Sequence, residues 1–235
     1  MRKNLFSQFF HRSRFLAVLV LLIALPLSLG AQSQKRTDPL ELLKLGNKRF
    51  VDDTHFKGVR DRAYRENPQT PYAVILSCSD SRVPPELVFG EWQSLGKLFV
   101  IRTAGNVVDP VALGSIEYAA ATLKAKLILV LGHEKCGAVE AARARATTPL
   151  SPNVAWFVDP IMLAVERTPV QGPETATIKE NVFVQIENLR NQSSIIRDLE
   201  ARRELSIAGG FYNISSVEKT GVVDFIYEAG SRRKK

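Results

Sequence analysis

The sequence predicts an α/β domain built on a mostly parallel central β-sheet flanked by helices. Three short, continuously apolar runs rich in branched residues, at 72–77, 98–101 and 127–131, are typical of strands that are buried on both faces of a parallel sheet. Segments with apolar residues at helical spacing separate and follow these runs. A chain of 235 residues is long enough for one such core and, without an export segment, too short for two average domains.

The first segment is typical of an export signal. A basic stretch at 1–14 precedes an apolar run at 15–29, and residues 28–31 supply small side chains for cleavage. The run is shorter than the roughly 20 residues of a spanning helix, although an uncleaved membrane anchor stays open. We expect residues 1–31 to be a signal peptide and the protein to be exported, to a periplasmic, thylakoid-lumenal or extracellular space.

An amphipathic helical arm is expected next. Asp38 before Pro39 is typical of a helix start with proline at the first helical position, and Leu40, Leu43 and Phe50 follow at helical spacing.

The remaining segments are expected to complete the layers around the sheet. Helices are predicted where apolar residues keep helical spacing, and two more strands near the C-terminus are separated by a polar turn. The predicted helices are 111–124, 137–146, 154–167 and 174–203, and the predicted strands are 205–212 and 222–227. No repeat or linker interrupts them, so one domain is expected over 32–230, followed by a basic tail at 231–235.

The net charge of +8 comes mainly from the two ends of the chain. Basic residues gather before residue 15 and again at 232–235, so the domain between them is close to neutral. No basic stripe with interleaved aromatic residues is present, and no nucleic-acid partner is expected.

Reactive side chains follow two of the predicted strands, at the edge where α/β sheets bind ligands. Cys78 follows the first apolar run, and His133 and Cys136 follow the third. Two thiolates and one imidazole suit Zn2+, and three protein ligands leave a fourth position for water, as in catalytic zinc sites. The alternative is a disulfide between these two cysteines, since an exported protein meets an oxidising compartment.

Asp80 and Arg82 are expected to take part in the same site. Side chains two residues apart in an extended segment point to the same side, so both can face the cleft with Cys78. The Asp80 carboxylate either takes the fourth zinc position in a closed state, or pairs with Arg82 and accepts a hydrogen bond from zinc-bound water. An ordinary ion pair at a strand end is the simpler alternative.

With these motifs the sequence resembles the β-class carbonic anhydrases. The resemblance implies reversible hydration of CO2 to bicarbonate and a proton, by attack of zinc-bound hydroxide. It also implies one Zn2+ per subunit, held by Cys78, His133 and Cys136, with Asp80 and Arg82 as the family's catalytic pair. The matching segments are CSDSRVP at 78–84, RTAGNV at 102–107, GSIEYA at 114–119, HEKCGAV at 133–139 and GGFY at 209–212.

The resemblance further implies a pocket and an assembly. Gln69, Phe99, Tyr118 and Gly137 fall where the plant-like branch of the family lines its substrate pocket, although Phe99 and Tyr118 are equally compatible with the core. The family forms homodimers or higher even oligomers, in which N-terminal helices embrace the neighbour and two subunits build the pocket. Contact with a membrane is expected only if the signal is uncleaved.

Two other functions stay open from the sequence. The same zinc site is adapted in some proteins to the hydrolysis of CS2 or COS, which a narrowed or apolar access path would favour. A catalytically silent exported scaffold or binding protein would be favoured by the loss of a ligand, of Asp80 or of Arg82. None of these residues is missing.

Overall fold

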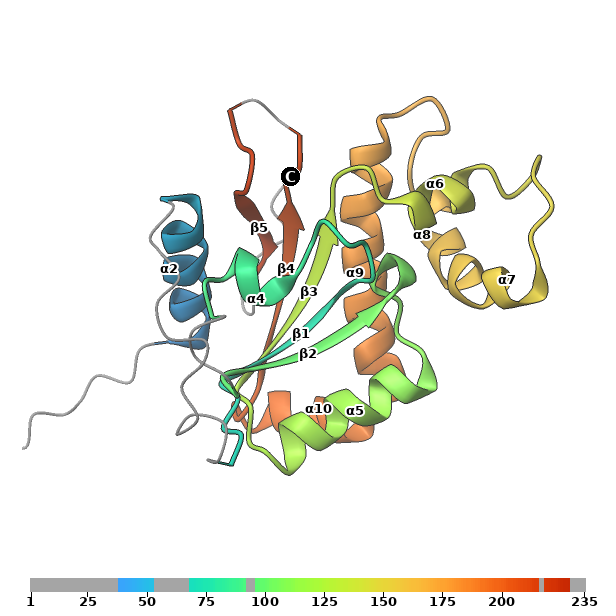
Figure 1. Ribbon diagram of the computed structural model, residues 1–235. Coiled ribbons are helices and arrows are strands. Elements are labelled where there is room, and N and C mark those ends of the chain that lie inside the picture. Colours follow the sequence, from blue (N-terminus) through green and yellow to red (C-terminus); the bar gives the residue numbers. More distant parts are fainter. Residues whose placement is uncertain (1–37, 53–67, 92–95, 216–217, 229–235) are drawn as a thin grey trace, which may run out of the picture. The chain divides into compact units, whose positions relative to one another are not determined.

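A five-stranded sheet forms the centre of the computed structural model, which describes residues 38–52, 68–91, 96–215 and 218–228 (Figure 1). The strand order is β2-β1-β3-β4-β5; the first four are parallel, and β5 is antiparallel to β4. The predicted α/β fold with a mostly parallel sheet is therefore confirmed. The strands are β1 (Ala73–Cys78), β2 (Leu98–Thr103), β3 (Leu127–His133), β4 (Ser206–Tyr212) and β5 (Val223–Tyr227).

Helices cover both faces of this sheet (Figure 1). One face packs against α2 (Pro39–Val51) and α4 (Pro85–Val88). The other face packs against a larger set: α5 (Pro110–Ala121), α6 (Gly137–Arg143), α7 (Pro152–Val158), α8 (Met162–Glu166), α9 (Glu174–Gln192) and α10 (Ser194–Ala201). The predicted signal at 1–31 and the tail at 231–235 lie outside the described residues. Within the described ranges, no helix combines the length and the apolar character needed to cross a membrane.

Burial on both faces explains the continuously apolar strands. In β1, Val74 and Leu76 belong to the core beneath α5 and α9, whereas Ala73 and Ile75 belong to the core beneath α2 and α4. All four side chains are fully buried. Because neither face is in contact with water, the alternation of polar and apolar residues seen in half-exposed strands is lost.

Several predicted boundaries shift for local reasons. The predicted helix 154–167 is divided into α7, a short 3-10 turn Asp159–Ile161 and α8, because Pro160 lies within it. The predicted helix 174–203 breaks at Ser193, whose side chain accepts a hydrogen bond from the Ile196 amide and starts α10. Strands β1 and β3 extend further than predicted, so that Cys78 and His133 are their last residues.

The helical arm α2 docks on its own chain through two adjacent residues. Gly46 lies so close to α4 that an added Cβ would be 1.9 Å from the carbonyl oxygen of Phe89. The Asn47 side chain donates hydrogen bonds to the carbonyls of Val88 (3.1 Å) and Gly221 (2.9 Å). The expectation that this arm embraces a neighbouring subunit stays a prediction.

Substituting Gly46→Ala is expected to lower the stability of the protein by about 1–3 kcal/mol, because the new methyl group meets backbone atoms that cannot move aside cheaply. Gly114→Ala is the matched control. That glycine is exposed inside α5, and apart from its chain neighbours and the backbone of its own helix no atom lies within 4 Å of an added Cβ. Alanine should therefore stabilise the protein by about 0.5–1 kcal/mol. Thermal melting followed by circular dichroism measures both changes. Shifts of the same sign in the two variants would contradict this account of the α2 contact.

Candidate metal centre

Cys78, His133 and Cys136 meet at the carboxyl edge of the sheet. Cys78 and His133 end the neighbouring strands β1 and β3, and Cys136 is the residue that precedes α6. Their ligand atoms all lie within 4.8 Å of one another, and all three residues are buried. The structure thus brings together the three residues that the sequence singled out as a zinc site.

The geometry of the two thiols suits a metal ion and not a disulfide. The sulfur atoms of Cys78 and Cys136 are 4.0 Å apart, and both cysteines are free. A disulfide requires a separation of about 2.05 Å. Two sulfur atoms bound tetrahedrally to zinc, each about 2.3 Å from the ion, are about 3.8 Å apart.

The His133 ring is already oriented for a metal. Its Nδ1 lies 2.9 Å from the carbonyl oxygen of Glu134, and a proton on Nδ1 makes this a hydrogen bond. Nε2 then carries a lone pair, and it is buried without a hydrogen-bond partner in a residue that is 0% exposed. A buried nitrogen without a partner is costly unless a bound ion accepts its lone pair. The residues present therefore fit Zn2+.

Hydrogen bonds at the site also shift the pKa values of the two thiols. The hydrogen bond with the Cys136 thiol lowers the pKa of Cys78 against the effect of burial, and the Gly105 amide acts in the same direction. The same bond raises the pKa of Cys136. One thiolate is therefore present before any metal binds, and binding a cation releases the second proton.

Asp80 is held by Arg82 in the turn that follows β1. The Arg82 side chain donates to both carboxylate oxygens, at 2.9 and 2.6 Å, and the Arg82 amide donates to Oδ1 at 2.9 Å. These bonds, chiefly those from the side chain, lower the pKa of Asp80 to about 2. Arg82 Nη2 also donates to the carbonyl of Lys135 at 3.1 Å, which ties this pair to the turn that carries Cys136. Of the two arrangements that the sequence left open for Asp80, the carboxylate thus has the one in which it pairs with Arg82.

Arg102, at the carboxyl end of β2, forms hydrogen bonds with the backbone of the site. The sequence analysis assigned no role to this residue. Its Nε donates to the carbonyl of Cys78 at 3.0 Å, and its Nη2 donates to the carbonyl of Asp80. Cys78 and His133 were singled out because they follow the carboxyl ends of predicted strands. The same criterion would have found Arg102.

The four predicted pocket residues lie in two places. Gly137 is exposed beside Cys136, with open space where a Cβ would be. Gln69 precedes β1, Phe99 is the second residue of β2, and the Tyr118 ring lies 6.5 Å from the Phe99 ring. Because β2 pairs with Cys78 only at its last residue, Thr103, and each residue rises about 3.3 Å, Phe99 lies roughly 13 Å further down the sheet. Of these four residues, only Gly137 lies next to the metal centre of its own chain.

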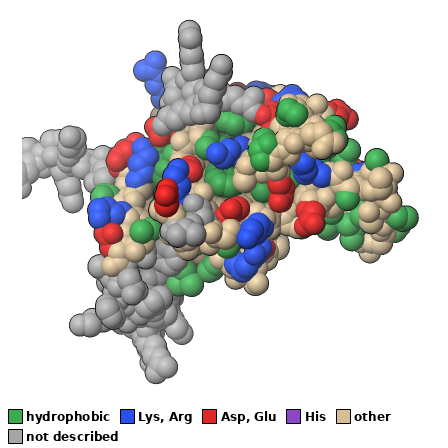
Figure 2. All heavy atoms as spheres, turned by 90° about the horizontal axis from the view of Figure 1, so that it is seen from above, with side chains coloured by type: hydrophobic (Ala, Val, Ile, Leu, Met, Phe, Trp, Pro, Cys, Tyr) green, Lys and Arg blue, Asp and Glu red, His purple; other side chains and the backbone are tan. Residues whose placement is uncertain are grey.

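The surface beyond this site is chemically mixed. Figure 2 shows acidic and basic side chains interspersed over the upper face of the described protein.

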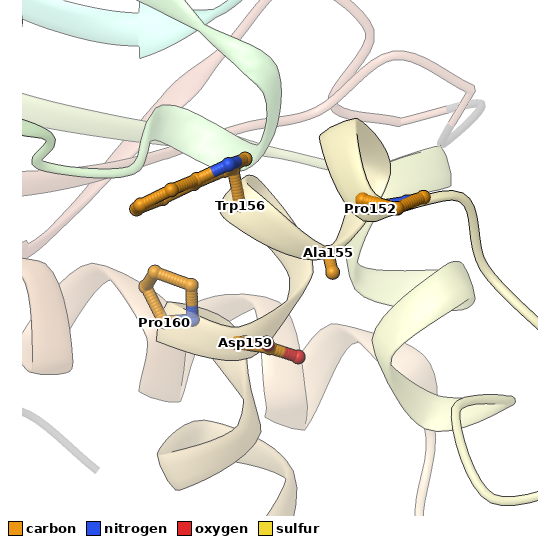
Figure 3. Close-up of a pocket in the computed structure, with 5 residues that line it drawn as sticks. All are labelled: Pro152, Ala155, Trp156, Asp159 and Pro160. Atoms are coloured by element: carbon orange, nitrogen blue, oxygen red, sulfur yellow. The ribbon is translucent and has the colours of Figure 1, made fainter.

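A separate hollow of about 460 Å3 lies on α7 and the turn after it, with the rings of Trp156 and Pro160 projecting to one side (Figure 3). Its lining contains a single carboxylate and none of the metal-binding group. The lining residues are Pro152, Ala155, Trp156, Asp159 and Pro160.

Hydrogen peroxide is expected to oxidise the two thiols of the metal-free site to a disulfide. Hydrogen peroxide oxidises Cys78 to a sulfenic acid with release of one water, and the Cys136 thiol then displaces a second water as the sulfur–sulfur bond forms across the present 4.0 Å gap. Intact mass should show the loss of two hydrogen atoms, and zinc added beforehand should protect the thiols. Equal oxidation with and without zinc would show that the thiols do not share an ion. The Cys136→Ser variant, which has one thiol left, is the control for the internal disulfide.

Comparisons with known proteins identify the family of this chain. The family model described as carbonic anhydrase matches residues 73–219. Carbonic anhydrase 2 of Mycobacterium tuberculosis is 40% identical over 183 residues, which cover 73% of this chain and 86% of that protein. A β-carbonic anhydrase of Coccomyxa, solved with acetazolamide, aligns with a TM-score of 0.60 at 27% identity, over 81% of this chain and 86% of that one. Tetrameric β-carbonic anhydrases of Sordaria macrospora share the fold, with a TM-score of 0.58 at 22% identity, over 93% of this chain and 98% of that one. The chain belongs to the β-class carbonic anhydrase family.

Proposed function

We propose that this protein is an exported, zinc-dependent enzyme that reversibly hydrates CO2 to bicarbonate and a proton. The observation that carries the proposal is the buried Cys78–His133–Cys136 group, with its two free thiols and the unpartnered Nε2 of His133. Membership of the carbonic anhydrase family supports the same reaction.

Cys78, His133 and Cys136 would hold the Zn2+ ion of each subunit. When bound there, the ion supplies a Lewis acid that lowers the pKa of water to around 7, so that hydroxide is available for attack on CO2. Gly137, exposed and without a side chain, leaves room for the substrate next to Cys136.

Asp80 orients the attacking oxygen. Because Arg82 holds the carboxylate ionised, Asp80 can only accept a hydrogen bond and cannot donate one. It would therefore accept a hydrogen bond from the one O–H group of the nucleophile, which turns a lone pair of that oxygen toward the carbon of CO2. The bond from Arg82 to the Lys135 carbonyl keeps this acceptor fixed relative to the Cys136 turn.

The pocket is completed, in this proposal, by a second copy of the chain. Gln69, Phe99 and Tyr118 lie too far down the sheet to reach the centre of their own chain, and Tyr118 is 49% exposed. Strand β2 is also an edge strand of the sheet, and the Sordaria proteins of the same fold are tetramers. We assign the chain to the plant-like branch on these pocket residues. Light scattering should give a dimer or a higher even oligomer, and a monomer that is fully active would contradict the shared pocket.

Export is proposed from the basic and apolar segments at 1–31. Intact mass of the protein recovered from its host should show cleavage near Ala31. A full-length chain in the membrane fraction would instead indicate an anchor.

The deciding experiment is CO2 hydration followed by stopped flow with a pH indicator. The protein is used from Gln32 onward, loaded with zinc and kept reduced so that Cys78 and Cys136 stay free. A rate well above that of buffer establishes the enzyme. No rate from a zinc-replete protein would contradict the proposal, and hydrolysis of CS2 or COS by the same sample would then identify the alternative substrate.

A further inference from the structure

Two buried polar side chains on α9 have no part in the mechanism described above. Asn181 is 1% exposed and Gln185 is 0% exposed, in a helix whose buried face is otherwise largely apolar. Burying an amide costs about 1–3 kcal/mol unless its donors and acceptors are bonded. The partners of these two side chains therefore indicate what they do.

Both side chains hold the loop that follows β2. Asn181 Nδ2 donates to the carbonyl of Gly105 at 2.9 Å. Asn181 Oδ1 accepts a bond from Gln185 Nε2 at 3.0 Å, and Gln185 Oε1 accepts a bond from the amide of Val108 at 3.0 Å. The loop is therefore fastened to α9 at Gly105 and again at Val108.

Gly105 itself touches the metal centre. Its amide donates to the Cys78 sulfur, with a nitrogen–sulfur distance of 3.4 Å. Its φ of 68° lies in the left-handed region, and an added Cβ would be 2.6 Å from Ile161 Cδ1. Only glycine suits this backbone position. The residue is thus held by Asn181 at its carbonyl while its amide is directed at a predicted zinc ligand.

We infer that Asn181 is a positioning residue for the metal centre, which holds Gly105 so that its amide donates to the Cys78 thiolate. A hydrogen bond to a thiolate stabilises its negative charge and fixes the direction in which the sulfur offers its remaining lone pairs. Asn181 thereby sets how tightly, and with how much electron donation, Cys78 binds an ion. The inference rests on the proposed zinc site.

The test compares Asn181→Leu with Asn188→Leu. Asn188 lies two turns further along α9 and bonds to Gln185 Oε1, so its variant makes the same chemical change in the same helix and leaves the Gly105 bond in place. Zinc affinity is measured by competition with a chromogenic chelator. The thiolate-to-metal absorption band is recorded on the cobalt-substituted proteins, because a loss of general stability does not move this band in a folded sample.

Asn181→Leu should weaken zinc binding by about 10-fold to 100-fold and shift the cobalt band, while Asn188→Leu should do neither. Two variants that match each other in both measurements would overturn the positioning role. Loss of the role is distinguishable from failure of the proposed function, because in the latter case the unaltered protein itself binds no zinc or hydrates no CO2.

Two further measurements cover the case in which leucine at 181 prevents folding. Asn181→Asp keeps the size of the side chain and the acceptor for Gln185 but lacks the donor to Gly105, so it should give the same two changes. In the unaltered protein loaded with cadmium, a scalar coupling between the cadmium nucleus and the Gly105 amide proton should be observed through the Cys78 sulfur. Absence of that coupling would overturn the inference.

Discussion

His133→Ala should abolish zinc retention and CO2 hydration together. The substitution removes the only nitrogen of the proposed ligand set and leaves two thiolates, which cannot by themselves provide the three protein ligands of a catalytic zinc site. Metal content after dialysis, measured by mass spectrometry, should fall from one zinc per subunit to almost none. Cys78→Ala and Cys136→Ala should behave in the same way.

The control for this loss is Leu131→Ala. Leu131 lies on the same strand and is also fully buried, so its truncation leaves a cavity and costs about 2–5 kcal/mol of stability without removing a ligand. It should keep its zinc. Full zinc occupancy in His133→Ala, or equal loss of zinc in Leu131→Ala, would overturn the assignment of the ligands.

Asp80→Asn should keep the metal and lose most of the rate, by about 100-fold to 1,000-fold. The amide has nearly the same size, but it lacks the charge that pairs with Arg82. It can also present an N–H donor at the place where the O–H group of the nucleophile needs a hydrogen-bond acceptor. Zinc content should be unchanged, because the carboxylate is bonded to Arg82 and is not one of the three grouped ligands.

Asp159→Asn is the matched control for the loss of charge. Asp159 also pairs with an arginine, Arg145, at 3.3 Å, but this pair is exposed and lies in the turn after α7. An exposed pair contributes little to stability, so both the rate and the melting temperature should stay close to those of the parent protein. A turnover in Asp80→Asn as high as in Asp159→Asn would rule out the orienting role of Asp80.

Much of the fold could be predicted because strands that are buried on both faces have apolar residues at nearly every position of a short segment. The runs that became β1, β2 and β3 are almost entirely apolar, and in β1 and β3 every residue is buried, as a sheet covered on both faces requires. Helix ends were less predictable. Ser193 fits the helical spacing of its neighbours, and its capping bond to the Ile196 amide arises only where the backbone becomes extended at Ser193.

The metal ligands were determined by the sequence itself. Parallel strands bring their carboxyl ends to one edge, so the positions of Cys78, His133 and Cys136 along the chain were sufficient to predict that they meet. The tertiary structure alone decided the rest. It placed Gln69 and Phe99 away from the centre of their own chain, and it brought Asn181 to Gly105 across 76 positions of sequence. Contacts of this kind depend on how a helix lies against a loop far away in the chain, and no local pattern of residue types records that.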